Sequence, residues 1–183
     1  MPAPADHARG TVWLVLRAQS GDRAALEALL AHTDGLLRPY AMLMLRDGDA
    51  VDDVLQDVLL LVYRRLATLR EPRAFAAWAR RIASREIFRA LRGQRTHEQM
   101  HDELPPDFPA ETDPPLPPDG LLQRLPELLA RVSPASRAVL ALHYIDDLSL
   151  DETAAVLDLP MGTVKSRLAY GLATLRRVLA EEA

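Results

Sequence analysis

Residues 148–179 read LSLDETAAVLDLPMGTVKSRLAYGLATLRRVL, and this stretch decides the fold of the C-terminal part of the chain. Ser149 and Glu152 have the spacing of a capping box, in which two residues satisfy each other's backbone N–H groups at the start of a helix. Residues 158–160 end that helix, because the residue before a proline is pushed out of the helical region. Thr163 is the expected N-cap of a second helix, which follows at once.

The second helix of this stretch has two different faces. Val164 and Leu168 lie four residues apart and share its inner face. Small, polar and basic side chains remain to face outward, namely Lys165, Ser166, Arg167 and Tyr170. Two short helices joined by a tight turn, with a basic second helix, indicate a helix-turn-helix that reads the major groove of DNA. A helical hairpin without a DNA-binding role is the alternative.

The composition of the 183 residues favours helices and excludes several kinds of site. The chain is 49% hydrophobic and 5% aromatic, which suits a core of Leu, Ala and Val in one domain or two small ones. The absence of cysteine excludes disulfides, thiolate metal ligands and cysteine nucleophiles. Neither a membrane span nor the apolar core of a signal peptide is present, so we expect a cytoplasmic protein. The five histidines lack metal-binding spacing, and we expect no cofactor and no metal.

The net charge of −4 conceals an uneven distribution of charge along the chain. Residues 1–97 carry a net charge of +4, residues 98–119 carry −7, and residues 120–183 carry −1. Half of the 14 prolines lie in residues 105–118, where they block helix formation and favour an extended, semi-stiff linker. We therefore expect an acidic, proline-rich linker at 98–119 between helical domains at 1–97 and 120–183.

Four helices are predicted in the first domain, and the last two carry its chemistry. The apolar periodicity places these helices near 11–19, 22–45 with a break, 49–69 and 73–95, with a loop at 68–73. One face of the third helix is acidic and polar, with Asp52, Asp53, Gln56 and Asp57. Acidic residues in a first turn also complement the helix dipole, which is the purely structural explanation.

The fourth predicted helix carries seven arginines and one glutamate between Pro72 and Arg95. Helical geometry gathers basic and aromatic side chains on or beside one face, namely Trp78, Arg81, Arg85, Phe88, Arg89, Arg92 and Arg95. Because arginines neutralise phosphates and exposed aromatics stack on unpaired bases, this face predicts nucleic-acid binding. A solvated arginine face is the alternative, and a lone tryptophan such as Trp78 is more often a core residue.

Two further helices precede the helix-turn-helix in the second domain. One covers residues 121–129 with a slight break at Pro126, and the other begins at the Ser133-Pro134 cap. His143 lies among apolar residues, which favours a packed histidine over a ligand.

The pattern resembles the bacterial RNA polymerase sigma factors of the sigma-70 family, in the extracytoplasmic-function (ECF) group. The resemblance covers residues 20–95 and 121–180. Its motifs are Asp52-Asp53-x-x-Gln56-Asp57, Phe75-x-x-Trp78-x-x-x-Ile82-Ala83 and Gly162-Thr163-Val164-Lys165-Ser166-Arg167-Leu168, with Pro134-x-x-x-Arg137 in support. The run at 162–168 is close to a signature of the group.

The resemblance implies an all-α fold of two small helical domains, a sigma-2 bundle and a sigma-4 helix-turn-helix. In the first domain, Asp52, Asp53, Gln56 and Asp57 would dock on the clamp helices of the polymerase beta-prime subunit. The fourth helix and the loop at 68–73 would bind and melt the minus-10 element, with one base held out of the stack. The residues expected there are Arg73, Trp78, Arg81, Arg85, Phe88, Arg89 and Arg92.

In the second domain, the resemblance implies that the helix at 163–172 reads the minus-35 element, through Thr163, Lys165, Ser166, Arg167 and Tyr170. The implied partners are core RNA polymerase, through the beta-prime clamp helices and the beta flap, promoter DNA and an anti-sigma factor. The chain itself would neither enter a membrane nor catalyse a reaction. The acidic linker would thread the polymerase cleft toward the RNA exit channel.

The sequence departs from the family pattern at a few positions. The family commonly has Arg-Asn after the Ile-Ala pair of the fourth helix and an Asp four residues beyond the Asn, where this chain has Ser84, Arg85 and Arg89. This helix is therefore more basic than is usual, which affects the expected minus-10 preference. Thr153 stands where an Ile is usual, which is expected to weaken packing.

Other functions are compatible with parts of this pattern. A sigma mimic that sequesters an anti-sigma factor has less reason to keep a basic DNA face, and such mimics usually carry a receiver domain that this chain lacks. A dimeric DNA-binding regulator would not need the acidic helix or the long linker. An enzyme is the weakest alternative, because no nucleophile, base and orienting group can be assembled from the motifs.

Overall fold

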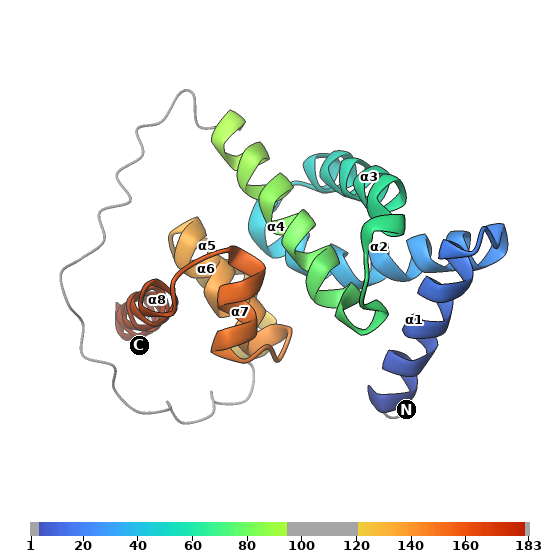
Figure 1. Ribbon diagram of the computed structural model, residues 1–183. Helices are drawn as coiled ribbons and strands as arrows, with labels where there is room; N and C mark the ends of the chain where they lie inside the picture. The colour runs from blue at the N-terminus through green and yellow to red at the C-terminus, as the bar shows by residue number, and fades with distance from the viewer. Residues whose placement is uncertain (1–3, 95–120, 182–183) are drawn as a thin grey trace. The chain divides into compact units, whose positions relative to one another are not determined.

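A computed structural model of the chain describes residues 4–94 and 121–181, and the regular elements in these ranges are helices (Figure 1). The all-α expectation is confirmed. The chain divides into two compact units, Met1–Gln94 and Arg95–Ala183. The expected linker at 98–119 and Arg95 lie outside the described residues, so the domain boundaries stay predictions. None of the described helices is long and apolar enough to span a bilayer.

The first unit is a bundle in which α2 (Arg23–Leu45) packs against three other helices. These are α1 (Pro4–Gln19), α3 (Gly48–Arg65) and α4 (Phe75–Gln94). Its core contains Val15, Leu29, Leu37, Tyr40, Met44, Val51, Leu55, Val58, Phe75 and Ile87, each almost fully buried. The first helix begins earlier than the sequence predicts, at Pro4 rather than near residue 11.

The predicted break in the second helix is wrong, because α2 continues through Pro39. Proline removes one helical hydrogen bond and commonly ends or kinks a helix. Pro39 itself is exposed, but Tyr40, Ala41 and Met44 immediately after it are at most 2% exposed. Continuing the helix places these side chains in the core, and their burial outweighs the lost bond.

Short polar side chains and one proline set the helix ends of the first unit. Asp22 is the N-cap of α2 and accepts a hydrogen bond from the Ala25 N–H at 3.0 Å. Asp47 caps α3. This helix ends at Arg65, before the predicted residue 69, because the chain tightens into a 3-10 turn, η1 (Leu66–Thr68). Pro72 begins a second such turn, η2 (Pro72–Ala74), which leads into α4.

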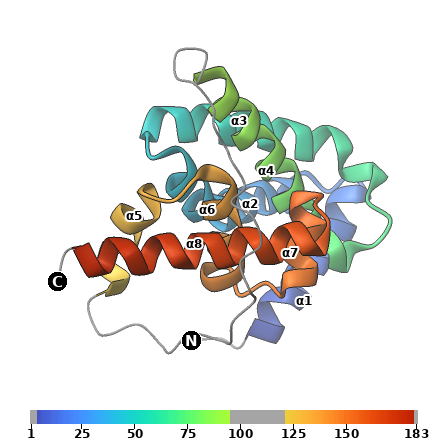
Figure 2. The same cartoon turned by 90° about the vertical axis from the view of Figure 1, so that its left-hand side faces the viewer.

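The second unit is built around the long C-terminal helix α8 (Met161–Glu181) (Figure 2). It contacts α5 (Leu121–Ala130), α6 (Pro134–Leu140) and α7 (Leu150–Leu157), and a π-helical turn, η4 (Ala141–Ile145), follows α6. Pro126 lies within α5 without breaking it. The core includes Leu129, Ala138, Val139, Leu142, Val156 and Val164.

The capping box at the start of α7 is confirmed, and the predicted N-cap of α8 is wrong. Ser149 Oγ accepts from the Glu152 N–H at 3.2 Å, and the Glu152 carboxylate accepts from the Ser149 N–H at 2.9 Å. The helix α8 begins at Met161, so Thr163 lies inside its first turn. The Pro160 carbonyl accepts the first bond of α8, from the Val164 N–H, so the connection between the two helices is shorter than predicted.

A buried arginine joins α6 to the end of α5. Arg137 is 6% exposed, and its Nε donates to the Leu129 carbonyl at 2.7 Å. Its Nη2 donates to the carbonyls of Ala130, at 3.1 Å, and Val132, at 2.9 Å. The last carbonyls of a helix lack partners within that helix. Arg137 therefore acts as the C-terminal cap of α5.

Candidate nucleic-acid and protein interfaces

The acidic side chains of α3 lie on its outer face, opposite the buried residues Val51, Val54, Leu55, Val58 and Val62. The structure brings Asp52, Asp53, Gln56 and Asp57 together there, all exposed. Asp52 is not isolated, because Arg38 Nη1 on α2 donates to its Oδ1 at 2.6 Å. Hydrogen bonds to Asp34, which has the larger effect, and to Asp52 raise the pKa of the Arg38 guanidinium above its usual value. An arginine is protonated at physiological pH even without this shift.

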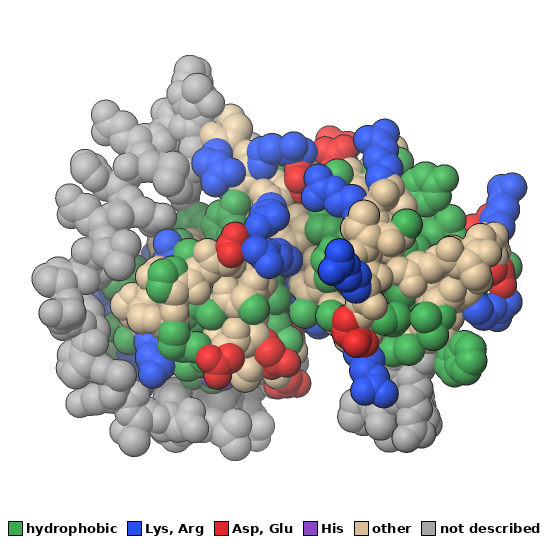
Figure 3. Space-filling view, viewed as in Figure 1, with side chains coloured by type: hydrophobic (Ala, Val, Ile, Leu, Met, Phe, Trp, Pro, Cys, Tyr) green, Lys and Arg blue, Asp and Glu red, His purple; other side chains and the backbone are tan. Residues whose placement is uncertain are grey.

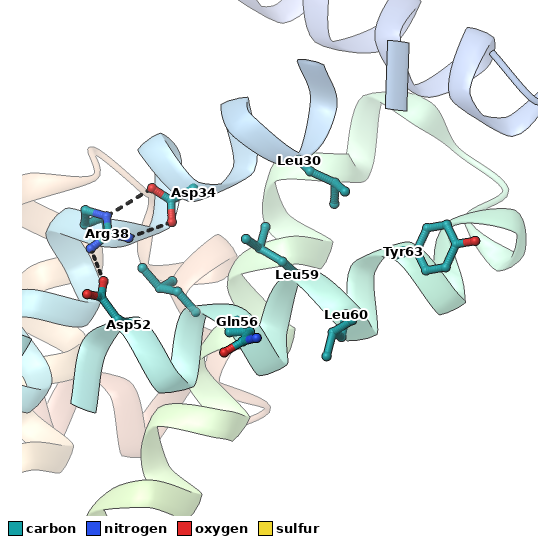
Figure 4. A pocket seen from close by; sticks show the side chains of 9 residues that line it. Leu30, Asp34, Arg38, Asp52, Gln56, Leu59, Leu60 and Tyr63 are labelled. Carbon is teal, nitrogen blue, oxygen red and sulfur yellow. Dashed lines mark hydrogen bonds and ion pairs between the residues drawn. The ribbon is translucent and has the colours of Figure 1, made fainter. Parts of the chain in front are cut away.

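A shallow groove of about 530 Å³ extends from this charged group along α2 and α3 (Figure 4). Figure 4 shows the Arg38 ion pairs at one end of the groove and Tyr63 at the other, with Leu59 and Leu60 between them. Leu60 is 45% exposed and Tyr63 is 57% exposed, and the two lie along the same groove. The surface therefore combines fixed charges with an apolar strip.

Leu60 and Tyr63 were missed by the sequence analysis, although a signal for them exists. They follow Gln56 at four and seven residues, so the three share one helical face. A surface helix normally shows polar residues at these positions. Apolar residues on the same stripe as the acidic motif could have been identified from the sequence as candidate contact residues.

The basic face of α4 is present, but its aromatic side chains are less exposed than predicted. Arg85, Arg89 and Arg92 are exposed, and Figure 3 shows basic side chains along the course of α4. Trp78 and Phe88, which were expected to be exposed, are half-buried, and so is Arg81. The Trp78 ring packs against the fully buried Phe75, with 5.9 Å between ring centroids, which explains its partial cover.

Two positions where α4 departs from the family pattern have different environments. Ser84 is 2% exposed, and its Oγ donates to the Tyr40 hydroxyl at 3.2 Å, so this residue is structural. Arg89 is exposed and forms ion pairs with Glu86 on its own helix and with Asp57 on α3, at 3.5 Å. An exposed pair contributes about 0–1 kcal/mol. The weak Arg89–Asp57 pair therefore leaves Asp57 available to a partner, while Arg89 also pairs with Glu86.

The loop before α4 contributes one expected DNA residue. Arg73 is exposed in η2, where its backbone N–H donates to the Glu71 side chain at 3.1 Å. This bond caps the turn through the backbone of Arg73 and does not involve its guanidinium group.

The expected minus-35 residues all lie in the first half of α8, yet they are not equally exposed. Lys165 is exposed, whereas Thr163, Ser166, Arg167 and Tyr170 are half-buried. The prediction that four side chains face freely outward is thus too simple. Ser166 Oγ donates to the Thr163 carbonyl at 3.0 Å, and Val164 is fully buried beneath them. Lys165 is the most accessible side chain of this group.

His143 packs as the sequence predicts. It is half-buried, its Nδ1 lies 2.6 Å from the Leu148 carbonyl oxygen, and its ring contacts Tyr144.

Comparison with known proteins places both units in one family. Residues 29–97 match the family described as Sigma-70 region 2, and residues 122–175 match Sigma-70, region 4. The ECF RNA polymerase sigma factor SigM of Mycobacterium tuberculosis is 30% identical over 176 residues, covering 94% of this chain and 86% of SigM. The RNA polymerase sigma-E factor of Streptomyces coelicolor is 32% identical over 153 residues, covering 84% of each.

Solved structures show the same architecture. The structure of CnrH in complex with the cytosolic domain of CnrY is similar at a TM-score of 0.69 and 26% identity, covering 95% of this chain and 99% of the solved chain. The sigma factor RpoE of Bartonella quintana, solved with the anti-sigma factor NepR, shares the fold at a TM-score of 0.64 and 22% identity, covering 84% and 96%. With both regions present in order, this chain belongs to the ECF RNA polymerase sigma factors of the sigma-70 family.

Proposed function

We propose that this protein binds core RNA polymerase in the cytoplasm and directs it to promoters through separate minus-10 and minus-35 contacts. The observation that carries the proposal is the pairing of each sigma-70 region with an accessible surface of the required chemistry. Region 2 has the acidic face of α3 and the basic face of α4, and region 4 has the helix-turn-helix.

The docking surface for the polymerase is the acidic face of α3 together with the apolar strip of the groove beside it. Asp53 is exposed beside the Arg38–Asp52 pair, and Tyr63 and Leu60 provide apolar contact area. Interfaces commonly combine aromatic anchors with charges that steer association. The beta-prime clamp helices are the partner of this surface, and the beta flap is the partner of region 4.

The promoter contacts fall on two helices. Arg85, Arg89 and Arg92 on α4 neutralise phosphates of the minus-10 region, while Trp78 and Phe88 offer partly exposed rings to an unpaired base. In region 4, Lys165 and its neighbours at the start of α8 contact base edges of the minus-35 element.

An anti-sigma factor is the expected regulator. CnrH, which resembles this chain over nearly its whole length, was solved with the cytosolic domain of CnrY. The acidic and apolar faces proposed for polymerase binding are surfaces that such an inhibitor would cover.

Run-off transcription from a genomic promoter library, with core polymerase and with or without this protein, tests the proposal. We expect a defined set of new transcripts, and a protein that yields none is not an initiation factor but a sigma mimic or another binding protein. Lys165→Ala is expected to weaken binding to promoters that depend on the minus-35 element by about tenfold. Asp53→Arg is expected to reduce core binding, whereas Glu27→Arg, a charge reversal on the exposed side of α2, serves as the matched control.

A further inference from the structure

The helix α1 carries a tryptophan, Trp13, that is not part of the core of the first unit. Trp13 is 68% exposed, more than any other large apolar side chain described, while Val15 on the same helix is fully buried in the core. The matched family region begins at residue 29, so α1 lies outside it. A single exposed apolar side chain is common on protein surfaces, so Trp13 marks a contact surface only together with the groove beside it.

Trp13 is part of the lining of a surface groove. This groove, of about 390 Å³, lies between α1 and the η2 turn that leads into α4. Its lining includes Trp13, Pro72, Arg73 and Phe75. The groove therefore brings one tryptophan and one arginine together with apolar residues. Its volume lies in the range of sites that bind small molecules, about 300–1,000 Å³.

The groove continues the surface proposed for the minus-10 element. Arg73 belongs to that surface, and Phe75 contacts the ring of Trp78, which lies on α4. The groove lining thus includes Trp13 and also Phe75, a residue in contact with Trp78. The unpaired strand of a melted promoter presents planar bases on a polyanion, and this is the chemistry that an aromatic ring beside an arginine binds.

We propose that the groove between α1 and η2 binds one unpaired base of the melted promoter strand, with Trp13 as the stacking platform and Arg73 as the phosphate contact. The inference rests on the proposed function and extends its DNA-binding surface beyond the matched family region. It adds a residue, Trp13, that neither the acidic motif nor the basic helix indicates.

The test uses holoenzyme assembled from core polymerase and the full chain, bound to pre-melted promoters in which single nucleotides of the unpaired strand are replaced by abasic sites. Stacking on an aromatic side chain is worth about 1–3 kcal/mol per base, so the wild type is expected to bind about tenfold more weakly when the stacked base is missing. Trp13→Ala should remove this sensitivity at one position only, and Trp13→Phe should restore most of it. Leu16→Ala is the matched control, because Leu16 is 44% exposed on the same helix but is not part of the groove lining.

Each outcome separates the two proposals. If Trp13→Ala keeps the full abasic profile of the wild type, the groove does not bind a base, while the minus-10 surface of α4 stands. If the wild type is insensitive at every position, the minus-10 function itself is wrong. If Trp13→Ala and Leu16→Ala instead weaken core binding equally, α1 is a protein-docking face and the base-binding inference is overturned.

Discussion

The hydroxyl of Thr153 in the helix-turn-helix is a buried polar group without a hydrogen-bond partner among the described residues. Thr153 is 0% exposed, in the middle of α7, where the family usually has an Ile. Burying an unpaired hydroxyl costs about 1–3 kcal/mol in mutational studies. Thr153→Val keeps the shape and removes the hydroxyl, so we expect the second unit to become more stable by about 1–2 kcal/mol.

Two other buried threonines provide matched controls for this substitution. Thr33, also 0% exposed, donates its hydroxyl to the Leu29 carbonyl at 2.7 Å, and Thr174 donates to the Tyr170 carbonyl at 3.0 Å. Because these hydroxyls are satisfied, Thr33→Val and Thr174→Val are expected to be neutral or to cost up to about 1 kcal/mol. The three variants differ in the state of the hydroxyl rather than in the size of the change.

Thermal unfolding followed by circular dichroism, together with calorimetry to separate the units, measures the effect. A gain of about 1 kcal/mol raises the Tm of a domain of this size by about 4–8 °C. A Thr153→Val protein that unfolds at or below the wild-type temperature would refute the assignment of an unsatisfied hydroxyl. A gain of the same size for Thr33→Val would show that any buried Thr→Val change stabilises the chain, whatever its bonding.

Three further predictions concern a close helix contact, a buried cation and a helix cap. Gly171→Ala should destabilise the second unit in urea unfolding, because the added Cβ would lie 2.8 Å from Leu140 Cδ1. Gly35 has open space around it, so Gly35→Ala should instead stabilise the first unit by up to about 1 kcal/mol. Arg137→Lys should lower the free energy of unfolding of the second unit by about 2–4 kcal/mol, because an ammonium cannot replace the guanidinium fork that caps α5. Urea unfolding measures this change, and an unchanged midpoint would contradict the capping role. Two hydrogen bonds lower the pKa of the Asp22 carboxyl below its ordinary value of 3.8: the one from the Ala25 N–H has the larger effect, and the one from Arg17 adds to it. The stabilisation by Asp22 should therefore be complete above pH 3.8 and be lost as the pH falls through the folded-state pKa, and Asp22→Asn should flatten that part of the acid-unfolding curve.

Local signals in the sequence predicted much of the helical architecture correctly. The capping box at Ser149 and the cap at Ser133 depend on residues within four positions of each other, so sequence spacing determines them. The continuation of α2 through Pro39 could not be read this way, because it depends on burial against other helices. The predicted start of α8 was too late, because the helix begins directly after Pro160, whose carbonyl accepts the first helical bond, and so needs no side-chain cap at Thr163.

The candidate surfaces divide in the same manner. Periodicity alone identified the acidic face of α3 and the basic face of α4, because both follow from the 3.6-residue repeat. The pairing of Asp52 with Arg38 joins residues 14 positions apart, and the pairing of Asp57 with Arg89 joins residues 32 positions apart. Such contacts depend on how helices pack, which no local spacing determines.

The sequence by itself determined the family, the all-α class and the chemistry of each helical face, because motifs, caps and periodicity are local properties of the chain. Only the tertiary structure decided which side chains remain accessible: it covered Trp78 partly with Phe75, buried Ser84 against Tyr40, and left Trp13 exposed beside a groove. Exposure is a property of neighbours brought together by packing, and those neighbours are distant in the sequence.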